Sequence, residues 1–189
     1  MQQQEVRDEN EKEVFKSFPV TTPPPPFVFD VVGVFRKHHS LCDTSTLKND
    51  SPKSDGVLEI MCPDLLSLGF EVEQGKSADE KIHRPVLFGE NGIQEVKYEI
   101  DAFHSGFSCG LEVEAGRAWK GNAVYRDLIL ASLMYDVDHF IIAVPNEYWF
   151  RVKGKSMMSK DYNNSTALAD TIFAHDRIKL PYNLTIIGY

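Results

Sequence analysis

The alternation of apolar and polar residues is clearest in the middle of the chain. Residues 97–103 (KYEIDAF) alternate as a strand does, residues 104–107 read as a turn, and residues 109–114 (CGLEVE) read as the returning strand. Residues 122–135 then carry apolar positions at helical spacing, and residues 139–145 are mostly apolar, as in a buried strand that ends at a proline. The pattern predicts a β-hairpin followed by a helix and a buried strand.

The flanking segments complete a mixed α/β pattern. Asp55 is placed to cap a helix that runs to residue 68, and Gly69 is placed to end it. Further elements are predicted as strands at 70–73, 85–88 and 184–189 and a helix at 166–173. Residues 27–35 (FVFDVVGVF) fit either a strand or a buried helix. The order of helix, three strands, helix and strand predicts a mixed sheet with helices on its faces.

The N-terminal part has a different composition. Residues 1–17 are charged and polar, as in a helical or frayed arm, and residues 21–26 (TTPPPP) favour an extended polyproline conformation. The proline run is a stiff spacer or, alternatively, a proline-rich ligand for a partner. With 189 residues in all, we expect an arm and spacer over 1–26 and a single α/β domain over 27–189.

Composition limits the function classes. A net charge of −8 argues against a general nucleic-acid coat, but a metal-dependent nuclease can be acidic because its site concentrates carboxylates. The sequence has no apolar run long enough for a membrane span and no signal-peptide pattern at its start. Its three cysteines are far apart and form no metal-binding spacing. We therefore expect a cytoplasmic protein with reduced thiols and no membrane partner.

Candidate chemistry lies on one face of the central hairpin. A turn centred on residues 105–106 places Asp101 opposite Gly110 and collects four acids on one face: Glu99, Asp101, Glu112 and Glu114. The other face is apolar, with Tyr98, Ile100, Ala102, Leu111 and Val113. Acids on a solvent-facing strand are the alternative, but no Lys, Arg or Thr interleaves them. Carboxylates this close repel one another unless a cation neutralises them, and their hard oxygens suit Mg²⁺ or Mn²⁺.

The spacing of these acids resembles a known family. Asp101, ten intervening residues and then Glu112-Val-Glu114, followed by a helix and a hydrophobic strand, are similar to the PD-(D/E)XK nuclease superfamily. The segment 110–116 (GLEVEAG) looks like the second catalytic strand of type II restriction endonucleases that carry Glu-x-Glu or Glu-x-Gln. The resemblance spans roughly residues 55–146. It implies a restriction-endonuclease-like mixed β-sheet flanked by helices, with an αβββαβ core.

The resemblance also implies roles for individual acids. Asp101 and Glu112 would be ligands of Mg²⁺ (or Mn²⁺), and Glu59, on the first core helix, would add a further metal ligand by its position. Glu114 would be a catalytic residue where the family usually has a lysine that orients the attacking water and balances charge.

A positive charge from elsewhere in the chain would compensate for the lysine that Glu114 replaces. Lys120 or Arg117, just beyond the strand, is placed to reach back to the site. An ordinary solvated side chain is the alternative reading for both.

The expected function is hydrolysis of phosphodiester bonds by a metal-dependent endonuclease acting on double-stranded DNA. Related endonucleases often work as dimers, so a homodimer is possible. The alternative from another class is a catalytically inactive nuclease-like domain that serves as a DNA-binding or protein-interaction module. A third reading is a structural protein whose acids only solubilise an exposed sheet. Metal binding would separate the first reading from the other two.

Overall fold

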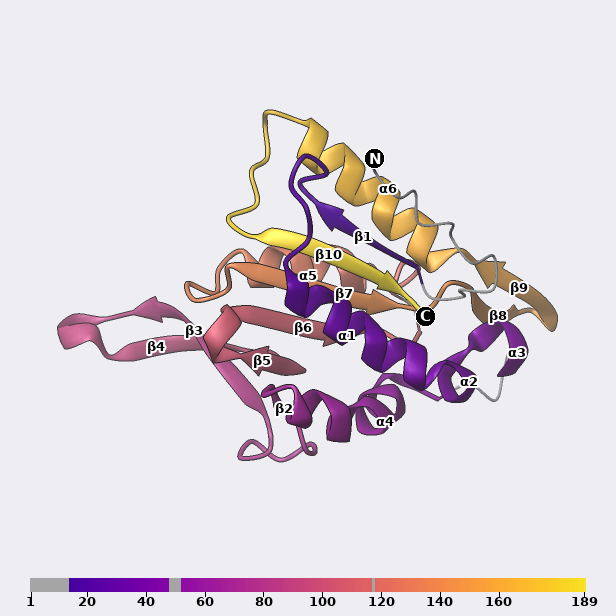
Figure 1. Ribbon diagram of the computed structural model, residues 1–189, viewed down its shortest axis with the longest axis horizontal. Coiled ribbons are helices and arrows are strands. Elements are labelled where there is room, and N and C mark those ends of the chain that lie inside the picture. Colours follow the sequence, from indigo (N-terminus) through magenta and orange to yellow (C-terminus); the bar gives the residue numbers. More distant parts are fainter. Residues whose placement is uncertain (1–13, 48–51, 117) are drawn as a thin grey trace, which may run out of the picture.

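The computed structural model describes residues 14–47, 52–116 and 118–189. Its centre is a six-stranded mixed sheet in the order β1-β10-β7-β6-β5-β2 (Figure 1). The strands of this sheet are β1 (Val14–Phe18), β2 (Glu71–Val72), β5 (Ala102–His104), β6 (Cys109–Val113), β7 (His139–Val144) and β10 (Asn183–Gly188). Strands β6, β7 and β10 run parallel, and the outer pairs are antiparallel.

Helices cover both faces of the sheet. The helices are α1 (Pro26–Lys37), α2 (His39–Cys42), α3 (Thr44–Leu47), α4 (Ser54–Ser67), α5 (Ala123–Ala131) and α6 (Asp161–Ala174). The apolar sides of α1 and α4 form one core with residues such as Leu111 of β6 and Ile141 of β7. Those of α5 and α6 form a second core with Phe140 and Ile142 on the opposite face of β7. Strand β7 is therefore buried on both sides, as its continuous apolar sequence predicts.

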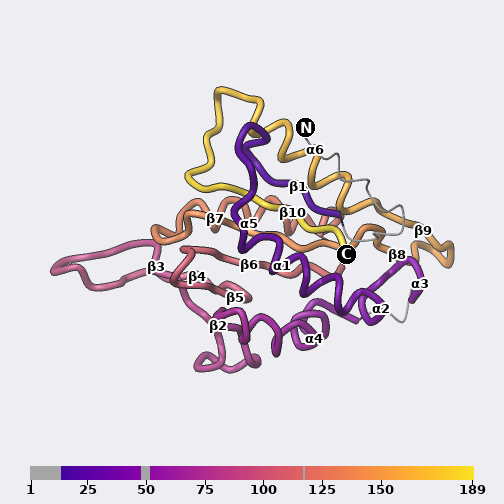
Figure 2. The backbone as a smooth tube through the Cα atoms, viewed as in Figure 1, coloured from indigo at the N-terminus to yellow at the C-terminus, as the bar shows by residue number. Residues whose placement is uncertain are grey.

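Two small hairpins lie outside the central sheet. Strands β3 (Ile82–Phe88) and β4 (Gln94–Ile100) form an arm that extends away from the sheet (Figure 2), with the short 3₁₀ helix η2 (Glu90–Gly92) at its tip. Strands β8 (Tyr148–Val152) and β9 (Lys155–Ser159) form the other hairpin. Arg84 fixes the arm, because its guanidinium lies 3.7 Å from the centre of the Phe103 ring and pairs with Asp136.

The expected fold class is confirmed. Helix α4, strands β2, β5 and β6, helix α5 and strand β7 follow one another in the predicted αβββαβ order, with the β3–β4 arm inserted after β2. The ambiguous segment 27–35 is helical: Pro26 occupies the first turn of α1, where its missing N–H costs nothing. Within the described residues, no helix combines the length and apolar character that crossing a bilayer requires.

The structure corrects the boundary of the N-terminal arm. Residues 14–18, which the sequence places in an arm outside the domain, form β1 and pair with β10 along the edge of the sheet. The reason lies in contacts that are distant in sequence: Phe15 and Phe18 pack against the two cores, while Lys16 and Ser17 contact Asp170 and Thr185. The rest of the predicted arm, residues 1–13, lies outside the described residues.

Candidate active site

The predicted strand 97–103 is interrupted at Asp101, and this interruption positions the Asp101 side chain in the site. Residues up to Ile100 belong to the arm, and residues from Ala102 belong to the central sheet. The Asp101 carbonyl accepts a hydrogen bond from the Glu73 N–H at 2.8 Å, and its carboxylate Oδ2 accepts one from the Val113 N–H at 2.8 Å. The side chain of Asp101 is therefore held against β6, beside the carboxylates of that strand.

The register of the hairpin differs from the expected one by two residues. Phe103, rather than Asp101, lies opposite Gly110, and Ala102 lies opposite Leu111, which brings Asp101 across from Glu112. The turn contains the 3₁₀ helix η3 (Ser105–Phe107), so its centre comes later than predicted. A shift by two residues leaves every side chain on its own face, so Asp101, Glu112 and Glu114 still share one.

The interruption at Asp101 also changes the expected positions of two residues, Ile100 and Glu99. Ile100 packs into the core under α5 and α6, whereas Ala102 packs under α1 and α4, so they do not share the predicted apolar face. A Cβ atom at Gly110 would lie 2.5 Å from Ile100 Cδ1, so only glycine leaves room for this crossing. Glu99 sits opposite His83 within the arm and is largely exposed, so it lies at the rim of the acidic face.

Helix α5 brings two further charged residues to the acids. Asp127 is only 2% exposed, and its Oδ1 accepts hydrogen bonds from Arg126. The Arg126 Nη2 lies 2.9 Å from Glu114 Oε1 and 2.8 Å from Asp127 Oδ1. Neither residue was predicted from the sequence. A signal existed, because Asp127 falls between Val124 and Leu128 on the buried side of the helix, where an unpaired acid is rare.

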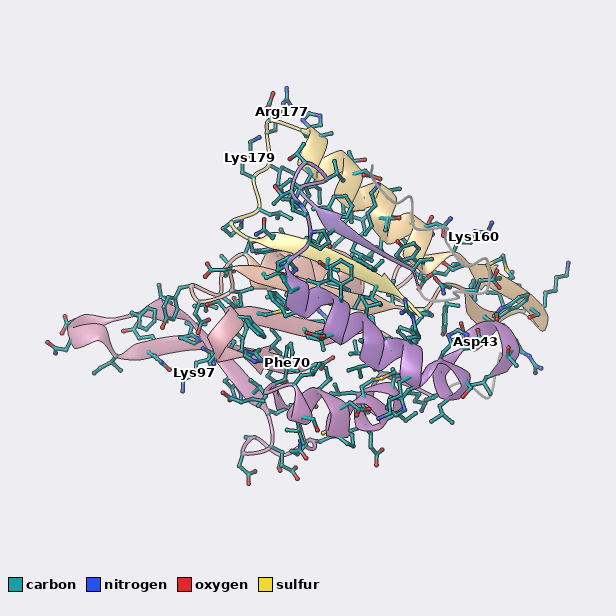
Figure 3. All side chains as sticks on the ribbon, in the orientation of Figure 1. Asp43, Phe70, Lys97, Lys160, Arg177 and Lys179 are labelled. Atoms are coloured by element: carbon teal, nitrogen blue, oxygen red, sulfur yellow. The ribbon has the colours of Figure 1, made fainter. Side chains whose placement is uncertain are left out.

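A cleft at the base of the arm, a cavity of about 430 Å³, is lined by residues that include Asp101, Glu112, Arg126 and Asp127. Glu114 is not part of this lining and lies beside it, in contact with Arg126. Lys81 lies at the same cleft, with its Nζ 2.6 Å from Glu73 Oε1 and 3.7 Å from Glu99 Oε2. Lys97, labelled in Figure 3, also lines the cleft from β4. The cleft thus has an acidic floor and several basic side chains around it.

Burial and mutual repulsion make these acids hard to ionise. Burial raises the pKa of Asp101 to about 6, although the Val113 N–H opposes the rise. Burial, with the nearby charge of Asp127, raises the pKa of Glu114 to about 7. The pKa of Glu112 is raised well above its usual range by burial and by Asp101, Asp127 and Glu114. A bound cation would remove the cost of ionising them together.

The donor set fits a hard divalent ion held through few protein ligands. Asp101 and Glu112 are close enough to share a hydrogen bond, and Asp127 Oδ2 is buried without a hydrogen-bond partner. In the part of the chain that the structure describes, no three His, Cys, Asp or Glu side chains are arranged as a ready metal site. Mg²⁺ does not need three, because it keeps several waters and binds through one or two carboxylates.

Two predicted site residues lie elsewhere. Glu59 is exposed on α4 and lines a separate cavity of about 410 Å³, because α4 turns Val57, Leu58 and Met61 toward the core. Lys120 Nζ lies 4.2 Å from the centre of the Phe150 ring in β8 and is not among the residues that line the cleft.

Arg117, the other predicted source of compensating charge, lies outside the described residues. Among the residues that the structure describes, the cation in contact with Glu114 is Arg126.

Comparison with known proteins supports the fold assignment. No protein-family model matches the sequence, and no curated protein matches it significantly. Among solved structures, the chain is similar to the restriction endonuclease BGLII complexed with a DNA 16-mer, with a TM-score of 0.54 and 8% sequence identity. The similarity covers 94% of this chain and 77% of that one. At this identity the likeness concerns the fold, which is restriction-endonuclease-like.

Proposed function

We propose that this protein is a Mg²⁺- or Mn²⁺-dependent nuclease that hydrolyses phosphodiester bonds in double-stranded DNA. The observation that carries the proposal is a cluster of carboxylates at a cleft: half-buried Asp101 and Glu112 and buried Asp127 line it, and half-buried Glu114 lies beside them. Such a cluster is costly to bury unless it binds a cation. The fold supports the proposal, since its structural neighbour is a restriction endonuclease complexed with DNA.

Each acid of the site has its own proposed role in metal binding or proton transfer. Asp101 and Glu112 would hold the ion, and the hydrogen bond from Val113 fixes the direction of the Asp101 carboxylate. When bound, the ion supplies Lewis-acid activation of water and of the phosphoryl group. Glu114, which follows Glu112 on the same face of the strand, would accept the proton of the attacking water. This role does not require the lysine that the family usually has at its position.

The proposal is tested by titrating Mn²⁺ into the protein in a calorimeter and by incubating the same sample with supercoiled plasmid. We expect Mn²⁺ binding and metal-dependent nicking that EDTA abolishes. Absence of Mn²⁺ binding would contradict the proposal. One specific observation favours the rival reading, a DNA-binding or protein-interaction module without activity, namely Glu114 in place of lysine. DNA binding without metal binding or cleavage would identify that module.

A homodimer is part of the proposal, and α5 offers the surface for it. Tyr125 and Ile129 are exposed on α5 at four-residue spacing, with Ile129 at 60%, and Leu133 is exposed in the turn that follows the helix. Exposed apolar side chains on one helix face are typical of interfaces. We expect Ile129→Glu to turn a dimer into a monomer in sedimentation velocity, because two charges would face each other across a two-fold axis. A wild-type monomer at micromolar concentration would contradict this prediction.

A further inference from the structure

Arg126 is the cation that the structure places against the carboxylate cluster. Its Nε donates to Asp127 Oδ1 at 2.8 Å, and its Nη2 donates to Glu114 Oε1 at 2.9 Å. Asp127 is buried, so this anchor is fixed, whereas the Arg126 side chain is 59% exposed and lines the cleft. The guanidinium is thus held on one side by the protein and open on the other.

The guanidinium keeps donors for a ligand. Arginine presents five N–H donors in a rigid fork, and the contacts to Glu114 and Asp127 use those on Nε and Nη2. In residues 14–47, 52–116 and 118–189, no acceptor is found at Nη1. A guanidinium that is fixed in place with Nη1 open is well suited to donate a charge-assisted hydrogen bond to a phosphate oxygen.

The other candidate cations are placed less favourably. Lys81 is occupied by Glu73 and Glu99, and its side chain is only 19% exposed. Lys120 lies over the Phe150 ring, away from the cleft. Lys97 is exposed on the arm and lines the cleft (Figure 3), but no contact joins it to the carboxylates.

We infer that Arg126 is a phosphate-binding residue, which contacts an oxygen of the nucleic-acid backbone beside the carboxylate cluster. Asp127 acts as its positioning residue, because it holds the guanidinium through a buried carboxylate. The positive charge missing at position 114 therefore comes from helix α5 rather than from the strand. This inference rests on the proposed nuclease function and names one residue that its substrate would touch.

The test uses Arg126→Gln, Arg126→Lys and the matched control Arg177→Gln. Arg177 is exposed on the loop between α6 and β10 (Figure 3), and its substitution changes the net charge by the same amount. Binding to a double-stranded oligonucleotide is measured by fluorescence anisotropy in Ca²⁺ at several salt concentrations. For Arg126→Gln we expect roughly tenfold weaker binding or more and a salt slope that is smaller by about one. Arg126→Lys should keep the slope and lose part of the affinity, and Arg177→Gln should match the wild type.

A parallel Mn²⁺ titration separates this inference from the proposed function. Arg126→Gln should bind Mn²⁺ at least as tightly as the wild type, because the substitution removes a positive charge that repels the ion and leaves Asp101 and Glu112 in place. An Arg126→Gln protein whose DNA affinity and salt slope equal those of the wild type overturns the inference alone. Loss of Mn²⁺ binding in Arg126→Gln overturns it too, since the arginine would then be structural. A wild type that binds neither Mn²⁺ nor DNA removes the proposed function and the inference together.

Discussion

Asp101→Asn is expected to abolish Mn²⁺ binding and DNA nicking while the fold stays intact. Asparagine keeps an oxygen that can accept the Val113 N–H, which the Asp101 carboxylate accepts at 2.8 Å. It removes the negative charge that a hard divalent ion requires. Substituting a residue that only hydrogen-bonds to a metal ligand typically lowers metal affinity by about 10–100-fold. Removing the ligand itself should therefore lower the affinity by at least about 100-fold. Nicking should fall by roughly 10³-fold, as it does when a main electrostatic contribution is lost.

Asp170→Asn is the matched control for this substitution. Asp170 lies on α6 and pairs with Lys16 at 2.7 Å on the exposed surface, so the same chemical change is made away from the cleft. We expect Mn²⁺ affinity and nicking to remain those of the wild type, because surface ion pairs contribute little. If Asp101→Asn binds Mn²⁺ as the wild type does, the ion is held elsewhere and the assignment of Asp101 and Glu112 as ligands is wrong.

The grouping of Asp101, Glu112 and Glu114 was predictable because it depends only on whether their positions are odd or even along the two strands. Alternation along two strands determines which side chains share a face, and an error of two residues in the register does not change that result. Asp101, Glu112 and Glu114 therefore come together in the structure although the turn contains an unexpected 3₁₀ helix. Their role as metal ligands and catalytic residues stays a prediction. The fold class was also predictable, because it follows from the order of helices and strands along the chain.

Other features depend on contacts that are distant in sequence. The alternating pattern runs through Asp101 without interruption, so it did not reveal that β4 leaves the sheet there to pair with β3. Strand β1 was hidden because its partner, β10, lies at the opposite end of the chain. Glu59 was predicted as a metal ligand only from its position on the first core helix. The packing of α4 turns it away from the cleft. Arg126 reaches Glu114 only through the docking of α5 on the sheet.

The free energy of unfolding of the metal-free protein is expected to fall as the pH rises from 6.5 to 8.5. The folded-state pKa of Glu114 is about 7, against 4.5 when unfolded, and that of Glu112 is raised well above its usual range. A raised pKa means that the folded state retains protons that the unfolded state releases. The resulting stabilisation is complete below the unfolded pKa and is lost as the pH rises through the folded one. Glu114 alone accounts for a loss of about 1 kcal/mol across this window, and Glu112 adds to it.

The pH window is chosen to avoid an opposing group. Burial lowers the pKa of His139 from 6.5 to about 4, so its contribution to stability is lost mainly between pH 6.5 and 4 and changes by only about 0.4 kcal/mol above pH 6.5. Urea denaturation in EDTA at pH 6.5, 7.5 and 8.5 therefore reports the carboxylates. Glu114→Gln is expected to reduce the slope, because it removes one raised group and lowers the charge around Glu112.

Saturating Mn²⁺ should remove this pH dependence, because the carboxylates are then deprotonated in both the folded and the unfolded state. A curve that Mn²⁺ flattens distinguishes a metal site from a mere cluster of buried acids. The ion binds only deprotonated carboxylates, so its stabilising effect grows as the pH rises through their raised pKa values. In Asp101→Asn, Mn²⁺ should leave the pH dependence unchanged, because the ion is no longer bound. A metal-free protein whose stability is flat or rises above pH 6.5 would contradict the joint burial of Glu112 and Glu114. A falling curve that Mn²⁺ leaves unchanged would mean that the acids are buried together without serving metal chemistry.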